Sequence, residues 1–204
     1  MCFFYPYQYF IRTIKMAVKE AIQEAVEILR SGGTILFPTD TIWGIGCDAT
    51  NSEAVARVIA LKKRQKNTGM IVLVNNDTML NNHIKEVPSN AWDIIDYSEK
   101  PTTIIYEDPK RVAANLLAED GSLGVRMVKD QFCQQLIGRF GKPIVSTSAN
   151  LSGTPFGGSF KDIDPTILKE VDYVVNLRQQ DRLKSTPSSI IKINLDGTFK
   201  IIRK

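Results

Sequence analysis

The sequence predicts a single α/β domain built on a twisted, mixed and largely open sheet that is flanked by helices. Apolar residues at helical spacings of three and four alternate along the chain with short apolar runs that are typical of buried strands. The length of 204 residues suits one large domain. The sequence contains no repeat, low-complexity tract or linker that would divide this domain.

The clearest helix is predicted over residues 17–30, where six apolar residues form one stripe. Gly32 or Gly33 can cap this helix, and a strand over 34–37 follows. The pattern Thr50-x-x-Glu53 resembles a capping box that opens a second helix ending near residue 64. Further helices are expected over 77–97 in two pieces, 109–117 and 129–140. Further strands are expected over 70–74, 102–106, 122–127, 143–147 and 173–177, with a final hairpin of 189–194 and 198–202.

Residues 1–15 are rich in aromatic side chains, but Pro6 and Gln8 interrupt the apolar run. Basic residues follow this run, which is the reverse of a secretory signal, and the run is too short to span a bilayer. We therefore expect an amino-terminal extension over 1–15 and a working domain over 16–204. If the extension is ordered, its aromatic side chains should pack on the domain or on a second copy.

The thiols and the histidine limit the kinds of chemistry that the chain can perform. Cys2, Cys47 and Cys133 are odd in number and lack a C-x-x-C spacing, so we expect reduced thiols in a cytoplasmic protein. His83, the one histidine, lies in a polar stretch and is expected to be a solvated helix residue. A Ser-His-Asp or Cys-His mechanism is therefore hard to build, and catalysis should depend on positioning and fixed charge. The net charge of +4 permits an anionic partner without requiring one.

Polar side chains directly follow the predicted strand over 34–37. Pro38 should end this strand, and the Thr-Asp-Thr sequence of 39–41 then lies at its carboxyl end, where α/β sheets usually bind ligands. Gly44 and Gly46 allow a ligand to approach the backbone closely. An ordinary strand-to-loop turn would have a similar sequence.

A basic cluster lies at the end of the second predicted helix. Cations stabilise the carboxyl end of a helix, so this cluster can be a solvated face. Alternatively, its mutual repulsion would be relieved by a polyphosphate, with Arg64 binding two phosphate oxygens and Lys62 supplying a mobile charge. The cluster consists of Arg57, Lys62, Lys63, Arg64 and Lys66.

Three further polar motifs coincide with the ends of predicted strands. They are the serine-rich stretch 146–153, the sequence Gly-Val-Arg at 124–126, and the sequence Thr-Pro-Ser-Ser-Ile at 186–190. Walker and Rossmann glycine patterns are absent from the sequence. The repetition of hydroxyl and basic groups at strand ends suggests a concave polar site for a nucleotide and a small polar molecule.

Taken together, these motifs resemble the YrdC-like threonylcarbamoyl-AMP synthase family over nearly all of residues 17–203. The matching motifs are Gly32-Gly33-Thr34, Pro38-Thr39-Asp40-Thr41-x-x-Gly44-x-Gly46, Lys62-x-Arg64, Pro101-x-Thr103, Val125-Arg126, Ser146-x-Ser148-Ala149-Asn150-x-Ser152-Gly153, Ser188-Ser189-Ile190 and Arg203. The resemblance implies a YrdC-like fold with a large positively charged cavity. It also implies a nucleotidyltransferase that forms threonylcarbamoyl-AMP and pyrophosphate from L-threonine, bicarbonate and ATP.

The resemblance also implies roles for individual residues. Lys62 and Arg64 would be the catalytic, phosphate-binding pair. The other expected ATP-binding residues are Thr103, Ser148, Asn150 and Arg203, and the expected threonine-binding residues are Thr39, Arg126 and Ser188. Mg2+ would bridge the phosphates with few protein ligands. The product would pass to a tRNA threonylcarbamoyl transferase complex, and tRNA or double-stranded RNA is a further expected partner.

The chain departs from the family pattern at four places around the expected pocket. Gln65 and Gly69 stand where the family has proline-containing sequences, Leu73 stands at the place of a common histidine, and Glu99-Lys100 replaces a Pro-Gly pair. These changes bear on threonine specificity and rate more than on fold. With no second domain expected after Arg203, the chain resembles the short form of the family.

Two other functions remain open on the sequence. A divergent relative without synthase activity could bind double-stranded RNA or tRNA in its basic cavity, and its affinity would then fall steeply with salt. A nucleotide hydrolase of the same fold would cleave ATP without using threonine. The Lys62-x-Arg64 and Ser148-Ala149-Asn150 motifs favour the synthase.

Overall fold

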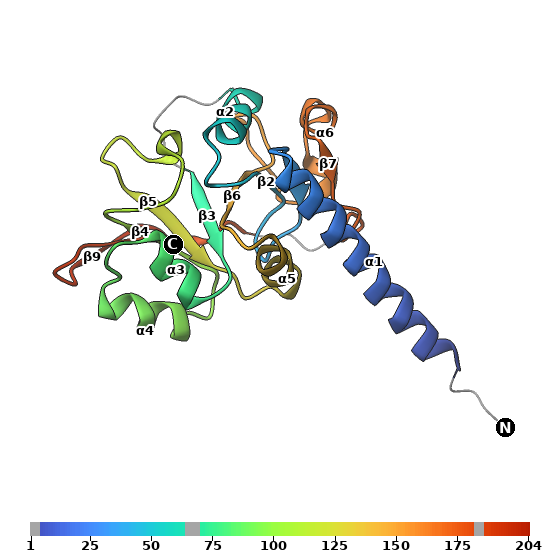
Figure 1. Cartoon of the computed structure of the whole chain (residues 1–204), viewed down its shortest axis with the longest axis horizontal. Helices are drawn as coiled ribbons and strands as arrows, with labels where there is room; N and C mark the ends of the chain where they lie inside the picture. The colour runs from blue at the N-terminus through green and yellow to red at the C-terminus, as the bar shows by residue number, and fades with distance from the viewer. Residues whose placement is uncertain (1–4, 64–69, 182–185) are drawn as a thin grey trace.

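The computed structural model describes residues 5–63, 70–181 and 186–204, with side chains from residue 15 onward. It confirms the predicted fold class, a single α/β domain on one mixed sheet (Figure 1). The strands are β1 (Ile35–Phe37), β2 (Gly44–Gly46), β3 (Ile71–Val74), β4 (Thr102–Tyr106), β5 (Leu123–Met127), β6 (Ile144–Ser148), β7 (Tyr173–Val174), β8 (Ser189–Ile193) and β9 (Phe199–Arg203). The helices are α1 (Tyr5–Arg30), α2 (Ser52–Leu61), α3 (Asp77–His83), α4 (Ser89–Tyr97), α5 (Gln131–Phe140) and α6 (Pro165–Glu170), with 3-10 turns η1 (Ala114–Leu116) and η2 (Phe160–Asp162).

The sheet is open, with the strand order β7-β1-β2-β6-β3-β5-β4-β8-β9. The pairs β1–β7, β3–β5 and β4–β8 are parallel, and the other neighbouring pairs are antiparallel. Strands from both halves of the chain therefore alternate across the sheet. This interleaving places strands from distant segments, with their polar ends, side by side in one sheet.

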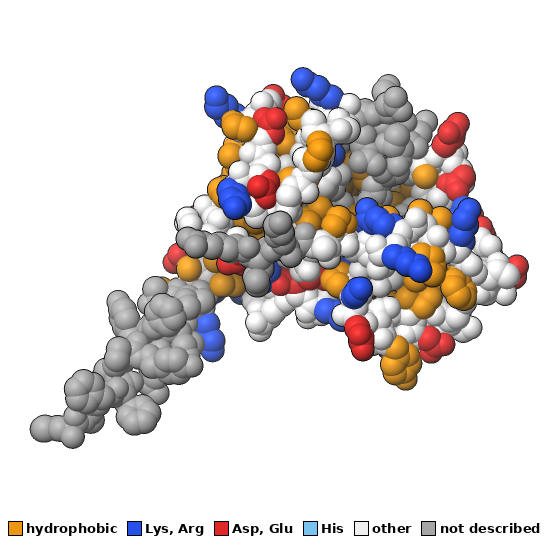
Figure 2. All heavy atoms as spheres, turned by 180° about the vertical axis from the view of Figure 1, so that it is seen from behind, with side chains coloured by type: hydrophobic (Ala, Val, Ile, Leu, Met, Phe, Trp, Pro, Cys, Tyr) orange, Lys and Arg blue, Asp and Glu red, His pale blue; other side chains and the backbone are white. Residues whose placement is uncertain are grey.

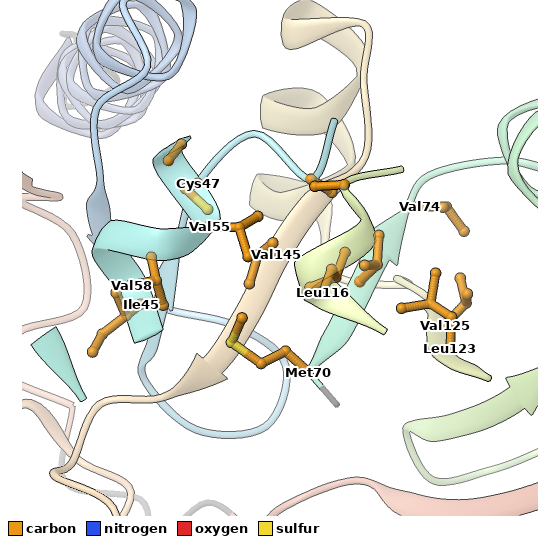
Figure 3. Close-up of a cluster of buried hydrophobic side chains, with 14 of the residues drawn as sticks. Ile45, Cys47, Val55, Val58, Met70, Val74, Leu116, Leu123, Val125 and Val145 are labelled. Atoms are coloured by element: carbon orange, nitrogen blue, oxygen red, sulfur yellow. The ribbon is translucent and has the colours of Figure 1, made fainter. Parts of the chain in front are cut away.

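Two hydrophobic clusters lie on opposite faces of the sheet. Helices α1 and α5 lie side by side over one face, where Ile35, Phe37 and Leu73 pack beneath them (Figure 1). The other cluster joins α2 and η1 to the alternate residues of the strands, among them Val74 and Val125 (Figure 3). Because successive side chains of a strand point to opposite faces, these buried residues fix which side chains remain on each face.

Short polar residues define the ends of two helices. Asn51, and not Thr50, caps α2, because its side chain accepts hydrogen bonds from the backbone N–H groups of Glu53 and Ala54. Thr50 instead donates its hydroxyl to Asp48 at 2.6 Å. Asp130 caps α5, and Gly141 ends it in a left-handed conformation with φ 78°.

The structure corrects the predicted limits of several elements. Helix α1 begins at Tyr5 and not near residue 17, because Pro6 falls in the first turn, where the missing N–H breaks no helical hydrogen bond. Figure 1 shows the amino-terminal half of α1 projecting from the domain. The long helix expected over 109–117 is wrong and only η1 forms, since Arg111 has a φ of 57° that an α-helix does not accept.

Two strands and the start of one helix also differ from the predictions. The stretch 44–46 was expected to be a loop but forms β2, in which a Cβ on Gly46 would lie 2.7 Å from the Val145 carbonyl O. The strand expected over 173–177 contains only two residues. Pro88 precedes α4 as its cap and is not its first residue.

The two described thiols are buried, and the histidine that was expected to be solvated is half-buried. Cys47 and Cys133 are free and buried, and burial raises the pKa of Cys47 to about 12, so that this thiol is unreactive at neutral pH. Cys2 lies outside the described residues. His83 is half-buried in the last turn of α3, with Nδ1 2.8 Å from the Met79 carbonyl O. Among the helices described, none is long and apolar enough to cross a membrane.

Candidate active site

The main cavity, which has the residues of the polar strand ends in its lining, lies on the sheet face that α1 and α5 only partly cover. Ile144 of β6 packs beneath α5, and Ser146 and Ser148 follow at alternate positions on the same face and line the cavity. The cavity has a volume of about 460 Å3, within the range of small-molecule sites. Its walls therefore continue the sheet beyond the hydrophobic core.

Residues from seven strands and their flanking loops line this cavity. Hydroxyl groups and two arginines supply its polar surface. The apolar side chains in its lining are Ile42, Met70, Ile71, Ile105, Ala118, Phe156, Pro187 and Ile190. The polar lining residues are Thr41, Thr103, Ser122, Arg126, Ser146, Thr147, Ser148, Ser188 and Arg203. The predicted convergence of strand ends is thus present in the structure.

Arg126 of β5 is the most deeply buried charge in the cavity wall, with 2% of its surface exposed. Its Nη1 donates to Thr41 Oγ1 at 3.1 Å, and its Nη2 lies 3.1 Å from Asp40 Oδ1. The second contact lacks the geometry of a hydrogen bond, and Nε and Nη2 have no hydrogen-bond partner among the described residues. Buried guanidinium donors without partners favour binding of an anion, above all a carboxylate.

The charge states support the same conclusion. Burial lowers the pKa of Arg126, and the nearby Asp40 only partly opposes this shift. Burial likewise raises the pKa of Asp40, against the influence of Arg126. Burial and the positive charge of Arg126 lower the pKa of Arg203. An anion placed between the two arginines would stabilise both charged forms.

Thr103, Ser188 and Arg203 form a connected wall where β4, β8 and β9 adjoin. The Thr103 and Ser188 hydroxyl oxygens are 2.8 Å apart, and both side chains are buried. Arg203 donates from Nε and Nη2 to the Ser188 carbonyl O at 2.9 and 2.7 Å. The arginine thus fixes the backbone of Ser188 at the cavity edge.

Lys62 occupies a different place from the one expected of a phosphate ligand. It directly follows α2, is 1% exposed, and does not line the cavity. Its Nζ donates to the Ser148 carbonyl O and, at 2.7 Å, to the Asn150 carbonyl O. Ser152 N–H in turn donates to the Lys62 carbonyl O at 3.0 Å. Lys62 therefore holds the end of β6 and the loop that follows it, which carry the predicted ATP-binding residues Ser148 and Asn150.

The other predicted residues divide between the cavity and its surroundings. Ser148, Thr103, Ser188, Arg126 and Arg203 line the cavity. Asn150 is not among the residues that line it, and its Nδ2 donates to the Thr154 carbonyl O at 2.5 Å. Arg64 and the departures at Gln65 and Gly69 lie outside the described residues.

Thr39 does not line the main cavity, although its neighbour Thr41 does. Its Oγ1 donates to the Ile42 carbonyl O at 2.8 Å and accepts from the Thr41 backbone N–H at 3.1 Å. It lines a smaller adjacent pocket of about 250 Å3. Within the Thr-Asp-Thr motif, Thr39 therefore shapes the loop, and Thr41 presents its hydroxyl to the cavity and to Arg126.

Two glycines line the cavity: Gly44, which was expected to let a ligand approach the backbone closely, and Gly124, for which no separate role was predicted. A Cβ on Gly124 would lie 3.2 Å from Ile71 and 3.3 Å from Thr103, and one on Gly44 would lie 2.9 Å from Ser146 Oγ. The absence of side chains thus deepens the cavity. For Gly124, the sequence signal for this role was a glycine within a strand-like stretch.

The remaining departures from the family pattern lie away from the main cavity. Leu73 is fully buried beneath α1 and α5 and contributes to the core. Glu99 and Lys100 line a second cavity of about 300 Å3, together with Asp40 and Ile94. Neither change places a new side chain in the main cavity.

The donor set of the main cavity indicates how a metal ion could be held there. Its described lining contains hydroxyls and arginines but no carboxylate. No cluster of three or more His, Cys, Asp or Glu side chains suited to a metal ion occurs among the described residues. A Mg2+ ion in this cavity would therefore be held mainly by phosphate oxygens, with hydroxyls as the available protein ligands.

Comparison with known proteins agrees with this geometry. The model of the Sua5/YciO/YrdC family, described as "Telomere recombination", matches residues 27–204. A protein of Xanthomonas axonopodis pv. citri named threonylcarbamoyl-AMP synthase is 33% identical over 158 residues, which cover 76% of this chain and 84% of the relative.

Solved structures show the same fold. Escherichia coli YciO matches with a TM-score of 0.74 and 26% identity over 90% of this chain and 88% of its own. Sua5 of P. abyssi, whose structure was determined in complex with L-threonine, matches with a TM-score of 0.75 and 24% identity over 84% of this chain. The present chain spans about half of that Sua5 chain, 50% of its length. The chain belongs to the Sua5/YciO/YrdC family.

Proposed function

We propose that this protein is an L-threonylcarbamoyladenylate synthase, a nucleotidyltransferase that converts L-threonine, bicarbonate and ATP to threonylcarbamoyl-AMP and pyrophosphate. The observation that carries the proposal is Arg126, a buried guanidinium in the cavity wall with two donor nitrogens that lack hydrogen-bond partners among the described residues. Relatives that share about a third of their residues with this chain are named for the same activity.

The cavity provides separate groups for an amino acid and a nucleotide. Arg126 would bind the threonine carboxylate, with Thr41 and Ser188 beside it. Ser148 and Arg203 would face the phosphates, and Lys62 would hold the loop that presents Ser148. The proposal also includes the roles that the family resemblance implies for three further residues. Arg64 and Asn150 would bind ATP, and Thr39 would bind threonine.

The reaction needs orientation and charge neutralisation and no protein nucleophile. The threonine amine would attack carbon dioxide derived from bicarbonate, losing a proton to form a carbamate. A carbamate oxygen would then attack the α-phosphorus of ATP as the bond to the bridging oxygen breaks and pyrophosphate leaves. Fixed cationic donors would stabilise the charge on the leaving pyrophosphate. Holding the substrates together in the cavity would lower the entropy cost of bringing them into the reacting geometry. Mg2+ would neutralise phosphate charge when bound.

The proposal is tested by pyrophosphate release from ATP, measured with and without threonine and bicarbonate, and by mass spectrometry of the adenylate. Release should require both co-substrates and should cease in Arg126→Gln. Lys161→Gln, at an exposed position outside the cavity, is the matched control and should retain full activity.

Two results would contradict the proposal. ATP cleavage that is independent of threonine would indicate a nucleotide hydrolase. Absence of pyrophosphate release together with salt-sensitive binding of double-stranded RNA or tRNA would indicate an RNA-binding module. Transfer of the product to a tRNA threonylcarbamoyl transferase remains part of the proposal and needs the downstream enzyme for its test.

A further inference from the structure

The carboxyl-terminal strand β9 forms one edge of the sheet. Within the described part of the chain, its one neighbour in the sheet is β8, so its outer edge presents backbone N–H and C=O groups to solvent. All five of its residues are exposed. Phe199, Ile201 and Ile202 are 61%, 50% and 51% exposed, which is unusual for three large apolar residues on one short strand.

The charges on this strand all have one sign. Lys200 and Arg203 lie within β9, Lys204 follows it, and the strand contains no acidic residue. Figure 2 shows hydrophobic side chains beside Lys and Arg on the lobe opposite the projecting helix, the side where Figure 1 places β9, with Asp and Glu at the margins of this lobe. An extended chain with apolar side chains and acidic neighbours would complement this edge in backbone hydrogen bonding, hydrophobicity and charge.

The edge is also continuous with the active-site cavity. The pairing of β8 with β9 shifts between Ile190↔Arg203 and Ile191↔Ile201, which leaves Ile202 as the extra residue of a bulge. On the far side of this bulge, Arg203 lines the cavity and donates to the Ser188 carbonyl O. A partner bound along β9 would therefore lie beside the cavity.

We propose that β9 is a docking edge for an extended, acidic and apolar segment of another protein, which adds to the sheet as a further strand. The docking edge is defined by residues 199–203. Resting on the proposed function, the partner would be the enzyme that consumes the adenylate. The product is a mixed anhydride that reacts with water, so docking next to the cavity would shorten its exposure to solvent before an amine takes the threonylcarbamoyl group and AMP leaves.

Two other occupants fit the same observations less well. Pairing of β9 with β9 of a second copy would bring two sets of basic residues together, and like charges across strands are destabilising. RNA would be attracted by the charge, but Phe199 is the one aromatic residue in β9 that could stack on a base, and aliphatic residues make up the rest of its apolar surface. Basic residues on an edge strand also prevent aggregation, a role that predicts no specific ligand.

The test uses the full chain, labelled with nitrogen-15, and an acetylated peptide amide of sequence Glu-Val-Glu-Val-Glu-Val-Glu. Backbone amide shifts should change along β9 and β8 on titration. Lys200→Glu should weaken binding about tenfold, the effect of reversing one contacting charge, whereas Lys161→Glu should leave it within about twofold. A peptide with Lys in place of Glu, and one N-methylated at alternate residues to remove half of its donors, should both bind at least about tenfold more weakly.

Equal binding of the Lys-containing or N-methylated peptide would overturn the proposal, as would shifts outside β8 and β9. Sedimentation that shows a dimer, without peptide binding, would assign the edge to a second copy. Binding of an oligouridylate that the peptide does not displace would assign it to RNA. Pyrophosphate release is measured on the same variants, because Lys200 lies outside the catalytic cavity and its substitution should leave release unchanged. A failure of docking is thus distinguished from a failure of the proposed function.

Discussion

The guanidinium of Arg126 lies 3.1 Å from the carboxylate of Asp40, yet the two groups form no hydrogen bond. The carboxylate partly balances the buried charge, and two of the arginine's donor nitrogens remain without a described hydrogen-bond partner. An unpaired buried donor costs about 1–3 kcal/mol, so a ligand that satisfies it gains a comparable amount. This relationship makes Arg126 the strongest candidate for substrate recognition.

Substitution of Arg126 by lysine should raise the KM for threonine by about 10- to 100-fold, the cost of one lost charge-assisted hydrogen bond of about 1.5–3 kcal/mol. Lysine keeps the charge but cannot form the two-pronged contact of a guanidinium with a carboxylate. The KM for ATP should change little. Steady-state pyrophosphate release, with each substrate varied in turn, measures both constants. An unchanged threonine KM would place the carboxylate elsewhere.

Substitution of Lys62 by methionine should loosen the loop after β6. The carbonyl oxygens of Ser148 and Asn150 would lose a charged donor, while most of the side-chain volume would be kept. We expect faster hydrogen exchange over residues 148–154, a lower melting temperature, and a decrease in kcat/KM of about tenfold or more. A residue that contacted only phosphate would instead alter ATP binding without changing exchange in the substrate-free protein.

The Thr103–Ser188 pair can be tested by a double-mutant cycle on stability. Thr103→Val should destabilise the fold by about 1–3 kcal/mol, because the Ser188 hydroxyl then loses its partner in a buried position. Ser188→Ala alone should have a similar effect. The double variant should cost less than the sum of the single variants, as measured by urea unfolding. Strict additivity would mean that the two hydroxyls do not interact.

Asp172 should make the stability of the fold depend on acid pH. Its carboxylate accepts hydrogen bonds from the Thr34 backbone N–H at 2.7 Å and from Arg57 Nη2 at 2.8 Å. Burial alone would raise the pKa of Asp172, but these contacts lower it below its ordinary value of 3.8. The resulting stability is present above about pH 4 and is lost as the pH falls through the lowered pKa.

Asp172→Asn should therefore lower the free energy of unfolding at pH 7 by about 1–2 kcal/mol, near the low end for charged hydrogen bonds because the contact with Arg57 is half exposed. The difference from the wild type should shrink below about pH 4. Denaturant unfolding at several pH values measures this trend. A difference that stays constant from pH 7 to pH 3 would show that the charge of Asp172 does not contribute.

Most strands could be predicted because their signals are local. The apolar run of β3 and the hairpin of β8 and β9 are encoded by neighbouring residues, and the structure confirms both. The failures arose where backbone geometry or packing overrode the pattern. Arg111 adopts a left-handed φ, which is incompatible with the helix predicted over 109–117. Residues 44–46, predicted to be a loop, form β2, where Gly46 packs closely against its neighbours.

The candidate site was predictable in its chemistry but only partly in its geometry. Motifs at strand ends identified Arg126 and Ser188, and the family resemblance added Thr103; all three line the cavity. The motifs could not show that Lys62 faces the loop after β6 or that Thr41, and not Thr39, faces Arg126. The Lys62 and Arg126 contacts join residues 88 and 85 positions apart in the sequence, and local patterns carry no information about such pairs.

The sequence by itself determined an α/β fold and the stock of hydroxyl and basic groups, because helical and strand periodicities and turn residues act over a few positions. Only the tertiary structure decided which of these groups share a cavity. That decision depends on the strand order, which interleaves distant segments, and on the alternation of side chains, which turns Ile144 toward the core beneath α5 and presents Ser146 and Ser148 to the cavity on the same face.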